Sequence, residues 1–373
     1  MCGFHDYGWF KVTYNEDSVR VMFNEPVKVI SSAVLNGGLS KTKSIVNLKV
    51  TGEELSCTDP KILALSKLNQ IGLGSDTVCL MTSADTSKAS VIRKYDEQIE
   101  VVSIITLGLS HASSAGDYVK NPHSNGTGTI NIIVIIDCDP TDSCLVNCLS
   151  TIAEAKARAL KKLSVMSKYS FSTATGTVTD AVAVACSERG ERVEYAGPAT
   201  RLGRLISSAV IEATVNAARS QDITPNRGVL NRLSEIGINL RELVDSGVEL
   251  FHPSERISSR EDAKKLLERA ILDISSDVNV ASLIFAAILL DEAGMEGALP
   301  NMSKEYFISD PVDLLADESI GIAIADYIAG SRAIHNFKMY ESRKPGVISK
   351  LPPFLDDAIS GLIAGAMTKI HID

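Results

Sequence analysis

The sequence predicts an α/β domain, rich in strands first and in helices later, followed by an all-α domain. Apolar and β-branched runs alternate with Gly, Asn and Ser as far as residue 186, whereas helical periodicity prevails beyond residue 228. Charge divides at the same place. Residues 1–228 contain 23 Lys+Arg and 23 Asp+Glu, and residues 229–373 contain 14 and 23, so the whole net charge of −9 lies in the second part.

Seven runs in the first part predict strands, because they combine β-branched residues with flanking turn residues. They occupy residues 19–23, 27–35, 44–50, 77–83, 101–110, 129–137 and 181–186. Two helices are expected late in this part, at 143–167 and 201–219, where apolar residues recur at helical spacing.

The segment 220–228 has the composition of a connector, and we place the boundary there, with domains at 1–222 and 229–373. Beyond it no strand-like alternation of comparable length occurs. Ser258 and Ser259 are candidate N-caps. The helices of the second domain are expected at 228–243, 259–275, 279–293, 313–330 and 356–370.

Composition excludes several classes of protein. With 45% hydrophobic and 22% charged residues, the chain resembles neither disordered nor fibrous proteins. An acidic second half without a basic stripe argues against nucleic-acid binding. No secretory signal or transmembrane segment is expected, which favours a cytoplasmic protein with seven free cysteines. The chain is a candidate homo-oligomer.

Four Gly-, Thr- and Asn-rich segments lie at the ends of predicted strands. Such places leave backbone N–H groups and short hydroxyls free to hold a ligand or an oxyanion. None is a Walker loop or a dinucleotide fingerprint, so a nucleotide cofactor is not indicated. The alternative for any one segment is that Gly marks a turn and Thr a strand. The segments are 32–38, 108–112, 126–131 and 174–180.

Glu154 and Lys156 add ionisable groups on the helix expected at 143–167. Because they are two residues apart, they point to different sides of the helix, so a mutual ion pair is not expected and one of them is a candidate to face a site. Solvated helix charge is the alternative for either residue.

Taken together, the motifs of the first part resemble the adenosylcobinamide amidohydrolase family of corrinoid salvage. The resemblance extends over about 31–214 and follows the family's order of motifs. It implies hydrolysis of the amide that joins the corrin ring's propionyl arm to aminopropanol, which gives adenosylcobyric acid. The motifs are SAVLNGG, IVN, CLMTSAD, TLGLSHASSAGD, GTGTINIIV, TIAEAKARAL, ATGTVTDAVAVA and YAGPATRLGRLI.

The chain departs from the family at His111, where Asn is usual, and it shows no Ser-His-Asp or Cys-His arrangement. Amide hydrolysis still needs a base, a nucleophile or activated water, and an oxyanion hole. We expect Asp180 or Glu154 as the base and Thr177 or Thr179 as the nucleophile. Substrate-positioning groups are expected at Asn36, Gly37, Gly128, Thr129 and Asn131.

Acidic residues in the second part predict a different chemistry. Glu318 and Asp326 are eight residues apart on an expected helix, about 80° apart in projection, so that they can share a face. Asp356 and Asp357 begin the last helix, where the dipole favours carboxylates even without a function. Carboxylates that hold Mg²⁺ beside Asn336 and Lys344 suit phosphoester hydrolysis.

The second part also resembles a family, the phosphatidylglycerophosphatase A family. The resemblance rests on the DESIGIAIADYIAG, NF, KPG and FLDDAISGLIA segments between residues 317 and 364. It implies a Mg²⁺-dependent phosphatase that binds substrate through Asn336 and Lys344. Asp326 stands where bacterial members have Asn. The implied metal ligands are Asp317, Glu318, Asp326, Asp356 and Asp357.

These resemblances lead to one main interpretation and two alternatives. The main interpretation is a bifunctional enzyme of corrinoid salvage, whose second domain dephosphorylates α-ribazole-5′-phosphate or a cobalamin phosphate. One alternative joins the amidohydrolase to a phosphatidylglycerophosphate phosphatase. The other is a corrinoid-binding protein with one inactive domain. The expected partners of the protein are small corrinoid and phosphorylated molecules.

Overall fold

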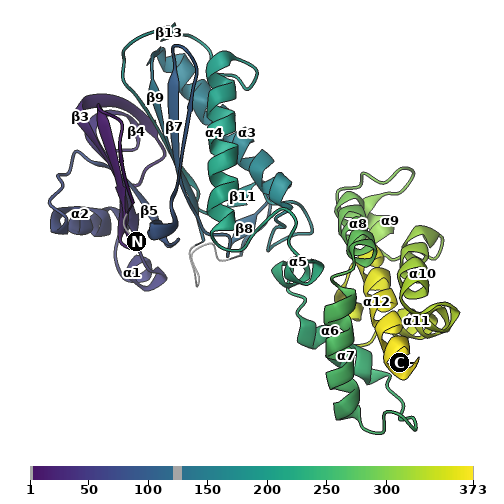
Figure 1. The fold of residues 1–373 in the computed structure, drawn as a ribbon. Coiled ribbons are helices and arrows are strands. Elements are labelled where there is room, and N and C mark those ends of the chain that lie inside the picture. Colours follow the sequence, from purple (N-terminus) through teal and green to yellow (C-terminus); the bar gives the residue numbers. More distant parts are fainter. Residues whose placement is uncertain (1–2, 121–127, 373) are drawn as a thin grey trace. The chain divides into compact units, whose positions relative to one another are not determined.

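The computed structural model describes residues 3–120 and 128–372, and the chain divides into two compact units at residues 225 and 226. The first unit contains one large sheet and two long helices, one before and one after the last strand of that sheet, and the second unit is helical from residue 229 to residue 372. This architecture confirms the predicted fold class (Figure 1).

A nine-stranded sheet forms the body of the first unit. Its main path runs in the order β1, β2, β3, β12, β9, β7 and β6, while β4 pairs with β3 and β5 pairs with β4. The strands are β1 (Gly3–Asp6), β2 (Phe10–Tyr14), β3 (Ser18–Ser31), β4 (Gly38–Lys49), β5 (Val78–Thr82), β6 (Ser90–Tyr95), β7 (Glu100–Leu107), β9 (Ile130–Asp137) and β12 (Ala181–Cys186).

Strand β3 joins two strands that the sequence pattern separates. The register with β4 shifts between Met22 and Val27, so one strand continues through an irregularity that contains Pro26. Proline has no backbone N–H to give to a ladder, which is why this position suits a bulge. The first part of β3 pairs with β2 and its last part pairs with β12.

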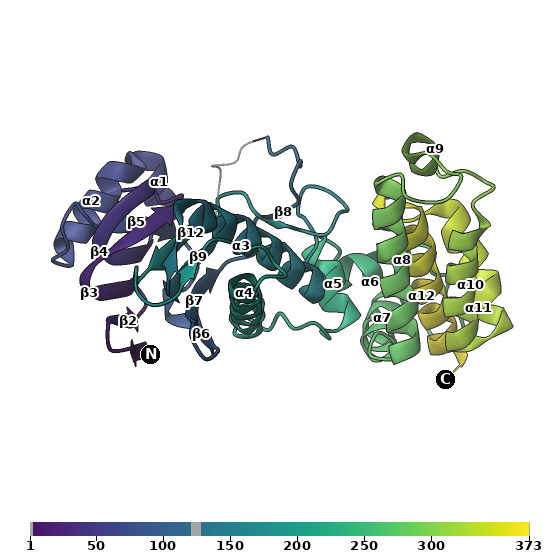
Figure 2. The same cartoon turned by 90° about the horizontal axis from the view of Figure 1, so that it is seen from above.

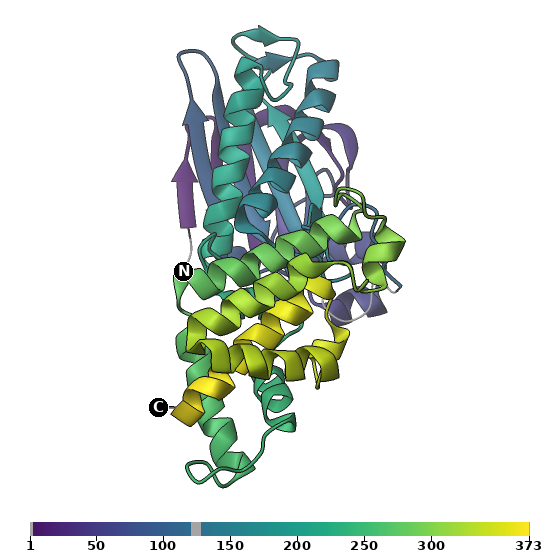
Figure 3. The ribbon, with the colours of Figure 1, turned by 90° about the vertical axis from the view of Figure 1, so that its right-hand side faces the viewer.

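Two helices cover one face of the sheet, α3 (Asp142–Leu163) and α4 (Arg201–Arg219) (Figures 1 and 3). Each begins with a threonine cap, because Thr141 accepts from the Cys144 N–H and Thr200 from the Gly203 N–H. Shorter helices α1 (Gly52–Cys57) and α2 (Pro60–Gln70) follow β4. The core beneath α3 and α4 includes Ile132, Val134, Ile136, Ile152, Leu160, Ile206 and Val210.

The strand directions bring several chain segments to one edge of the sheet. β9 and β12 are parallel, so the residues that precede both strands lie at the same edge. β7 is antiparallel to β9 and pairs Leu107 with Ile130, so its last residue is also at this edge. A short antiparallel ladder between β8 (Ala112–Ser113) and β11 (Gly176–Thr177) extends the same region.

In the second unit, helices surround α12 (Pro353–Ile372), whose residues are buried from Pro353 to Thr368 (Figure 2). The predicted helix 228–243 is interrupted at Gly237, where φ is 90°, and forms two helices. Ser259 caps α7 as expected. The other helices are α5 (Val229–Glu235), α6 (Leu240–Glu249), α7 (Arg260–Ile274), α8 (Val278–Met295), α9 (Lys304–Ile308), α10 (Leu315–Ala329) and α11 (Ser331–Arg343).

Among the described residues, one helix is long and apolar enough to cross a membrane when judged by length and composition alone. It is α8, of which a third is buried inside the structure. Its inward side is part of the bundle, because Asp291 is fully buried there and accepts hydrogen bonds from α12. A core helix passes the same test, so this is weak evidence for a span.

Candidate functional site

Asp180, which precedes β12, is the centre of a polar cluster at the sheet edge. Its Oδ2 is paired with Lys156 Nζ and accepts from the Thr177 N–H at 3.0 Å. Its Oδ1 accepts from Thr177 Oγ1 and from the Ile130 N–H, the latter at 2.9 Å. Four donors from α3, β9 and β11 therefore converge on one carboxylate.

The structure separates the two charged residues of the TIAEAKARAL helix. Lys156 lies on the inner side of α3 with 17% of its side chain exposed, where it reaches Asp180. Glu154 is exposed, and none of the hydrogen bonds or ion pairs found among the described residues involves its side chain. Of the two candidate bases, only Asp180 therefore belongs to the cluster. Lys156 was not among the predicted site residues. The available signal was its position two residues from Glu154, which places it on a different side of the same helix.

The two candidate nucleophiles also differ. Thr177 is buried and its hydroxyl donates to Asp180. Thr179 is exposed, and its backbone carbonyl accepts from Thr129 Oγ1 at 2.8 Å. The cluster contains the Thr177 hydroxyl and not that of Thr179.

Asn131 lies in a second, buried network beside this cluster. Its Nδ2 donates to Asn47 Oδ1 and to the Met81 carbonyl, both at 2.8 Å, and its Oδ1 accepts from the Ala181 N–H at 3.2 Å. Asn47 Nδ2 in turn donates to Thr106 Oγ1 at 2.8 Å. The network joins β4, β5, β7, β9 and β12, so these amides hold the strands beneath the cluster in register. Asn47 stood in the quoted IVN motif but was not among the predicted site residues.

Gly128 allows two loops of the edge to approach closely. A Cβ at this position would meet Ser110 Oγ at 2.4 Å and the Gly108 carbonyl oxygen at 2.9 Å. The Gly108 N–H donates to the Thr129 carbonyl at 3.0 Å. His111 follows in this loop, and its Nδ1 lies 2.7 Å from Tyr169 Oη. Positions 126 and 127 of the predicted GTGT segment lie outside the described residues.

Asn36 and Gly37 lie on the β5 side of the sheet. Asn36 adopts φ 56° and its Nδ2 donates to the carbonyls of Ser75 and Thr77, both at 2.8 Å. A Cβ on Gly37 would lie 2.5 Å from the Ala33 carbonyl oxygen, so the turn requires glycine. None of the hydrogen bonds found among the described residues joins these two residues to Asp180. They shape a loop at another part of the sheet.

A small cavity of about 90 Å³ adjoins the Asp180 cluster. Its polar wall is formed by Lys156 and Asp180, and its apolar wall by Ile132, Leu149 and Val182. The volume is about that of three water molecules, so it accepts a short side arm and excludes a large ring. An ion pair beside an apolar cavity is a suitable place to polarise a bound polar group.

Comparison with known proteins identifies the family of this chain. The family model described as adenosylcobinamide amidohydrolase matches residues 6–225, more than half of the sequence. The chain belongs to the adenosylcobinamide amidohydrolase family. The first predicted resemblance is thereby confirmed, and the N-terminal region has an adenosylcobinamide amidohydrolase-like function.

Individual proteins are also similar to this amidohydrolase family member. The adenosylcobinamide amidohydrolase of Methanosarcina mazei is 29% identical over 190 residues, which cover 48% of this chain and 85% of that protein. An uncharacterised protein of Methanocaldococcus jannaschii is 43% identical over 131 residues, which cover 34% of this chain and 98% of that protein. The crystal structure of the low temperature requirement C protein from Listeria monocytogenes is 19% identical, with a TM-score of 0.33, over 39% of this chain and 92% of that one.

Outside the amidohydrolase unit, carboxylates gather around the first turn of α12. Asp291 of α8 accepts from the Phe354 and Leu355 N–H groups at 3.0 and 2.9 Å, and so caps that helix. Burial, together with the negative charges of the neighbouring Asp356 and Asp317, raises the pKa of Asp291 to about 8. Asp291 was not among the predicted metal ligands.

Lys344 supplies the positive charge of this acidic cluster. Its Nζ contacts Asp310 and lies 2.5 Å from Asp356 Oδ2. Burial nevertheless raises the pKa of Asp356 to about 7, and that of Asp317 to about 6. Asp357 has its pKa raised to about 9 by burial and by Asp356, Asp317 and Glu341. Among the described residues, the buried carboxylates of this cluster thus outnumber the cation that pairs with them.

The chemistry of these donors fits Mg²⁺, since buried carboxylates with one cation among them attract a hard divalent ion. The geometry is not preformed. Within residues 3–120 and 128–372, no three His, Cys, Asp or Glu side chains already stand together as a metal-binding group. Cation binding therefore requires some of these side chains to rotate.

The structure does not bring Asp326 to this cluster, and it leaves the side chain of Glu318 at the cluster's edge. Asp326 is nine residues from Asp317 and thus about 180° around α10, so it is exposed when Asp317 is buried. Asp326 therefore lies outside the acidic cluster. Glu318 is exposed at the edge, and its charge raises the pKa of Asp317 and Glu341.

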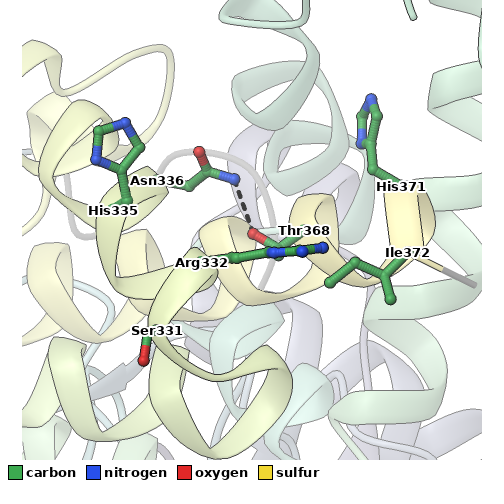
Figure 4. A pocket seen from close by; sticks show the side chains of 7 residues that line it. All are labelled: Ser331, Arg332, His335, Asn336, Thr368, His371 and Ile372. Atoms are coloured by element: carbon green, nitrogen blue, oxygen red, sulfur yellow. Dashed lines mark hydrogen bonds between the residues drawn. The ribbon is translucent and has the colours of Figure 1, made fainter. Parts of the chain in front are cut away.

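Asn336 lies about two turns of α11 before Lys344 and faces a different cavity (Figure 4). Its Nδ2 donates to Thr368 Oγ1 at 2.7 Å. The cavity has a volume of about 510 Å³ and is lined also by Arg332, His335 and His371. Asn336 and Lys344 are therefore not parts of one site in this structure.

Proposed function

We propose that this protein hydrolyses the amide between the corrin ring and aminopropanol in adenosylcobinamide, with adenosylcobyric acid as the product. The Lys156–Asp180–Thr177 cluster beside the small cavity is the observation that carries this proposal. The cavity has room for the aminopropanol arm, while the corrin ring remains outside at the sheet edge.

In the proposed reaction, Asp180 accepts the proton of the Thr177 hydroxyl along the hydrogen bond that already joins them. Thr177 Oγ1 attacks the amide carbon, the C–N bond breaks, and the departing amine takes the proton. Water then cleaves the ester to release the carboxylic acid and to restore the hydroxyl. Lys156 holds the Asp180 carboxylate in its orientation and is a positioning residue.

The test is formation of adenosylcobyric acid from adenosylcobinamide by the purified full chain. Asp180→Asn is expected to lower kcat at least 100-fold, because the base is replaced by a neutral amide. Glu154→Gln is the matched control, since this exposed carboxylate lies outside the cluster, and near-normal turnover is expected. Normal turnover by Asp180→Asn would refute the assignment of the base.

We propose for the helical unit a Mg²⁺-dependent phosphatase activity on α-ribazole-5′-phosphate. The surplus of buried carboxylates around Lys344 favours this second function. Asp317, Asp356 and Asp357 would hold the metal, which supplies charge neutralisation at the phosphoryl oxygens. Lys344 is close enough to Asp356 to bind a phosphate oxygen of the same substrate. Domains that are joined in one chain usually serve one pathway. By this analogy we favour α-ribazole-5′-phosphate over a lipid as the substrate.

Phosphate release with and without Mg²⁺ tests this activity, with Asp356→Asn as the inactive variant. Release from α-ribazole-5′-phosphate that needs both Mg²⁺ and Asp356 supports the proposal. Release only from phosphatidylglycerophosphate would assign the unit to a lipid substrate. An absence of release from either substrate, in protein that still hydrolyses adenosylcobinamide, would refute the phosphatase proposal.

A further inference from the structure

The small cavity beside Asp180 has a polar end and an apolar end. Lys156 and Asp180 form the polar end. Leu149 also lines the cavity and lies on the same side of α3 as Lys156, about two turns or 10 Å earlier along the helix. Val182 follows Asp180 by two residues and pairs with Ile132 of β9, and both side chains line the cavity. The cavity therefore leads from an ion pair to a group of apolar side chains.

Lys156 keeps donors available at the polar end. An ammonium group carries three N–H donors. Among the described residues, the hydrogen bonds found for Lys156 Nζ go to Asp180 alone. The backbone of β11 lies directly against this pair, because a Cβ on Gly176 would meet Asp180 Oδ2 at 2.5 Å and Lys156 Nζ at 2.7 Å. A ligand that enters the cavity therefore meets an ammonium group that still has N–H groups to donate.

The aminopropanol arm carries polar and apolar groups on the same scale as the cavity. Beyond the amide nitrogen it has a CH₂ group, and then a carbon with one hydroxyl and one methyl group. The cavity of about 90 Å³ holds about three groups of the size of a water molecule. The arm therefore fills the cavity, whereas an arm that is longer by one carbon exceeds it.

We propose that Lys156 holds the hydroxyl of this arm and that Leu149, Val182 and Ile132 recognise its methyl group. The inference rests on the function proposed above, and it adds which amine the site selects. The hydroxyl and the methyl group share one carbon, so the bond to Lys156 directs the methyl group away from the ion pair and toward the apolar end. The three apolar residues are then specificity-determining residues that take no part in the proton transfers.

This arrangement separates arms that differ by one carbon. An arm made from ethanolamine has the hydroxyl but lacks the methyl group, so the apolar end of the cavity stays empty. An arm made from aminobutanol has an ethyl group in place of the methyl group and collides with Leu149. A missing or an additional methylene group in an apolar pocket changes kcat/KM by about 10- to 200-fold.

The test compares adenosylcobinamides with an ethanolamine, an aminopropanol or an aminobutanol arm as substrates of the purified full chain. We expect kcat/KM for the aminopropanol arm to exceed that for each of the other two by at least about 10-fold. Leu149→Ala enlarges the apolar end and should raise kcat/KM for the aminobutanol arm at least about 10-fold above the wild-type value. Because a misfolded variant does not gain activity, this readout does not depend on an unchanged stability.

Two further variants complete the comparison. Leu149→Phe narrows the apolar end and should shift the preference from the aminopropanol arm to the ethanolamine arm. Leu205→Ala is the matched control, because Leu205 is a half-buried leucine of α4 that packs on the same core and lies outside the cavity lining. In this control the order of the three arms should be that of the wild type.

Three results overturn the inference. Equal kcat/KM for the three arms in the wild type would remove the selectivity and leave the proposed amide hydrolysis intact. Retention of the wild-type preference by both Leu149→Ala and Leu149→Phe would assign the selection of the arm to other residues. Hydrolysis of none of the three arms would refute the proposed function, and this inference with it.

Discussion

Lys156 and Asp180 form an ion pair in which the two side chains are only 17% and 14% exposed. They come from the middle of α3 and from the residue before β12, so the pair joins a helix to the edge of the sheet that it covers. A partly buried charge needs a partner to offset its lost hydration. Each charge therefore offsets the lost hydration of the other. The pair lies beside the cavity where we propose that the reaction takes place.

Removing Lys156 should harm both stability and turnover. Lys156→Met leaves the Asp180 carboxylate partly buried without its cation, and we expect unfolding free energy to fall by about 2–3 kcal/mol. Trp9, the one tryptophan of the chain, lies in the first unit, so its fluorescence during urea denaturation reports this change. Arg158→Gln, at an exposed position of the same helix, is the control and should change stability by less than about 0.5 kcal/mol.

The two threonines of the ATGTVTD segment should respond differently. Thr177→Ala removes the hydroxyl that donates to Asp180, and amide hydrolysis should decrease at least 100-fold. Thr179→Ala alters an exposed side chain and should leave kcat within about twofold of wild type. Thr177→Ser should retain measurable activity. If Thr177→Ala turned over normally, water and not Thr177 would be the attacking group.

The Asn47–Asn131 network should contribute to stability without taking part in the chemistry. Asn47→Ala removes two buried hydrogen bonds and leaves Thr106 and Asn131 with unmet bonding groups. We expect the free energy of unfolding, measured by Trp9 fluorescence during urea denaturation, to fall by about 2–4 kcal/mol. Asn69→Ala, at an exposed position near the end of α2, is the control. An effect on KM with no change in stability would argue for substrate contact.

The stability of the helical unit should fall as pH rises from 5 to 8. The pKa of Asp291 is raised to about 8 in the folded protein, so this state binds more protons than the unfolded chain between about pH 4 and pH 8. The contribution is favourable to folding at the low end of this window and is lost at its high end. In Asp291→Asn the pH dependence should be smaller. Urea denaturation followed by helical circular dichroism at pH 5, 6.5 and 8 measures the difference.

Mg²⁺ should stabilise the helical unit most at high pH, where the buried carboxylates lose their protons. At a concentration ten times the dissociation constant, binding adds about 1.4 kcal/mol. Asp357→Asn should reduce the stabilisation, whereas Asp326→Asn should not, because Asp326 points away from the cluster. Thermal denaturation with Mg²⁺ and with EDTA at pH 8 provides the measurement. If the Mg²⁺ stabilisation decreased equally in both variants, Asp326 would be a metal ligand.

Much of the architecture follows from local pattern. The β-branched runs became β7, β9 and β12, and the apolar stripes became α3 and α4, because periodicity reports which side of an element is buried. Two features depended on backbone details. The predicted strand 19–23 and residues 27–31 of the predicted strand 27–35 merge into β3 across an irregularity, and Gly237 divides the predicted helix 228–243. The hydrophobic period of a segment does not reveal a single residue with irregular backbone geometry.

Sequence alone determined that the chain contains an amidohydrolase domain and a helical domain, because short motifs in a fixed order and a change of period are properties of the linear chain. Tertiary structure decided which polar residues meet. It places Lys156 and Thr177 in contact with Asp180, but not Glu154 or Thr179. It also brings Asp291 close to Asp356, which is 65 residues away in the sequence, and leaves Asp326 exposed. The physical reason is that a side chain's partners depend on strand order and helix packing, which neighbouring residues do not specify.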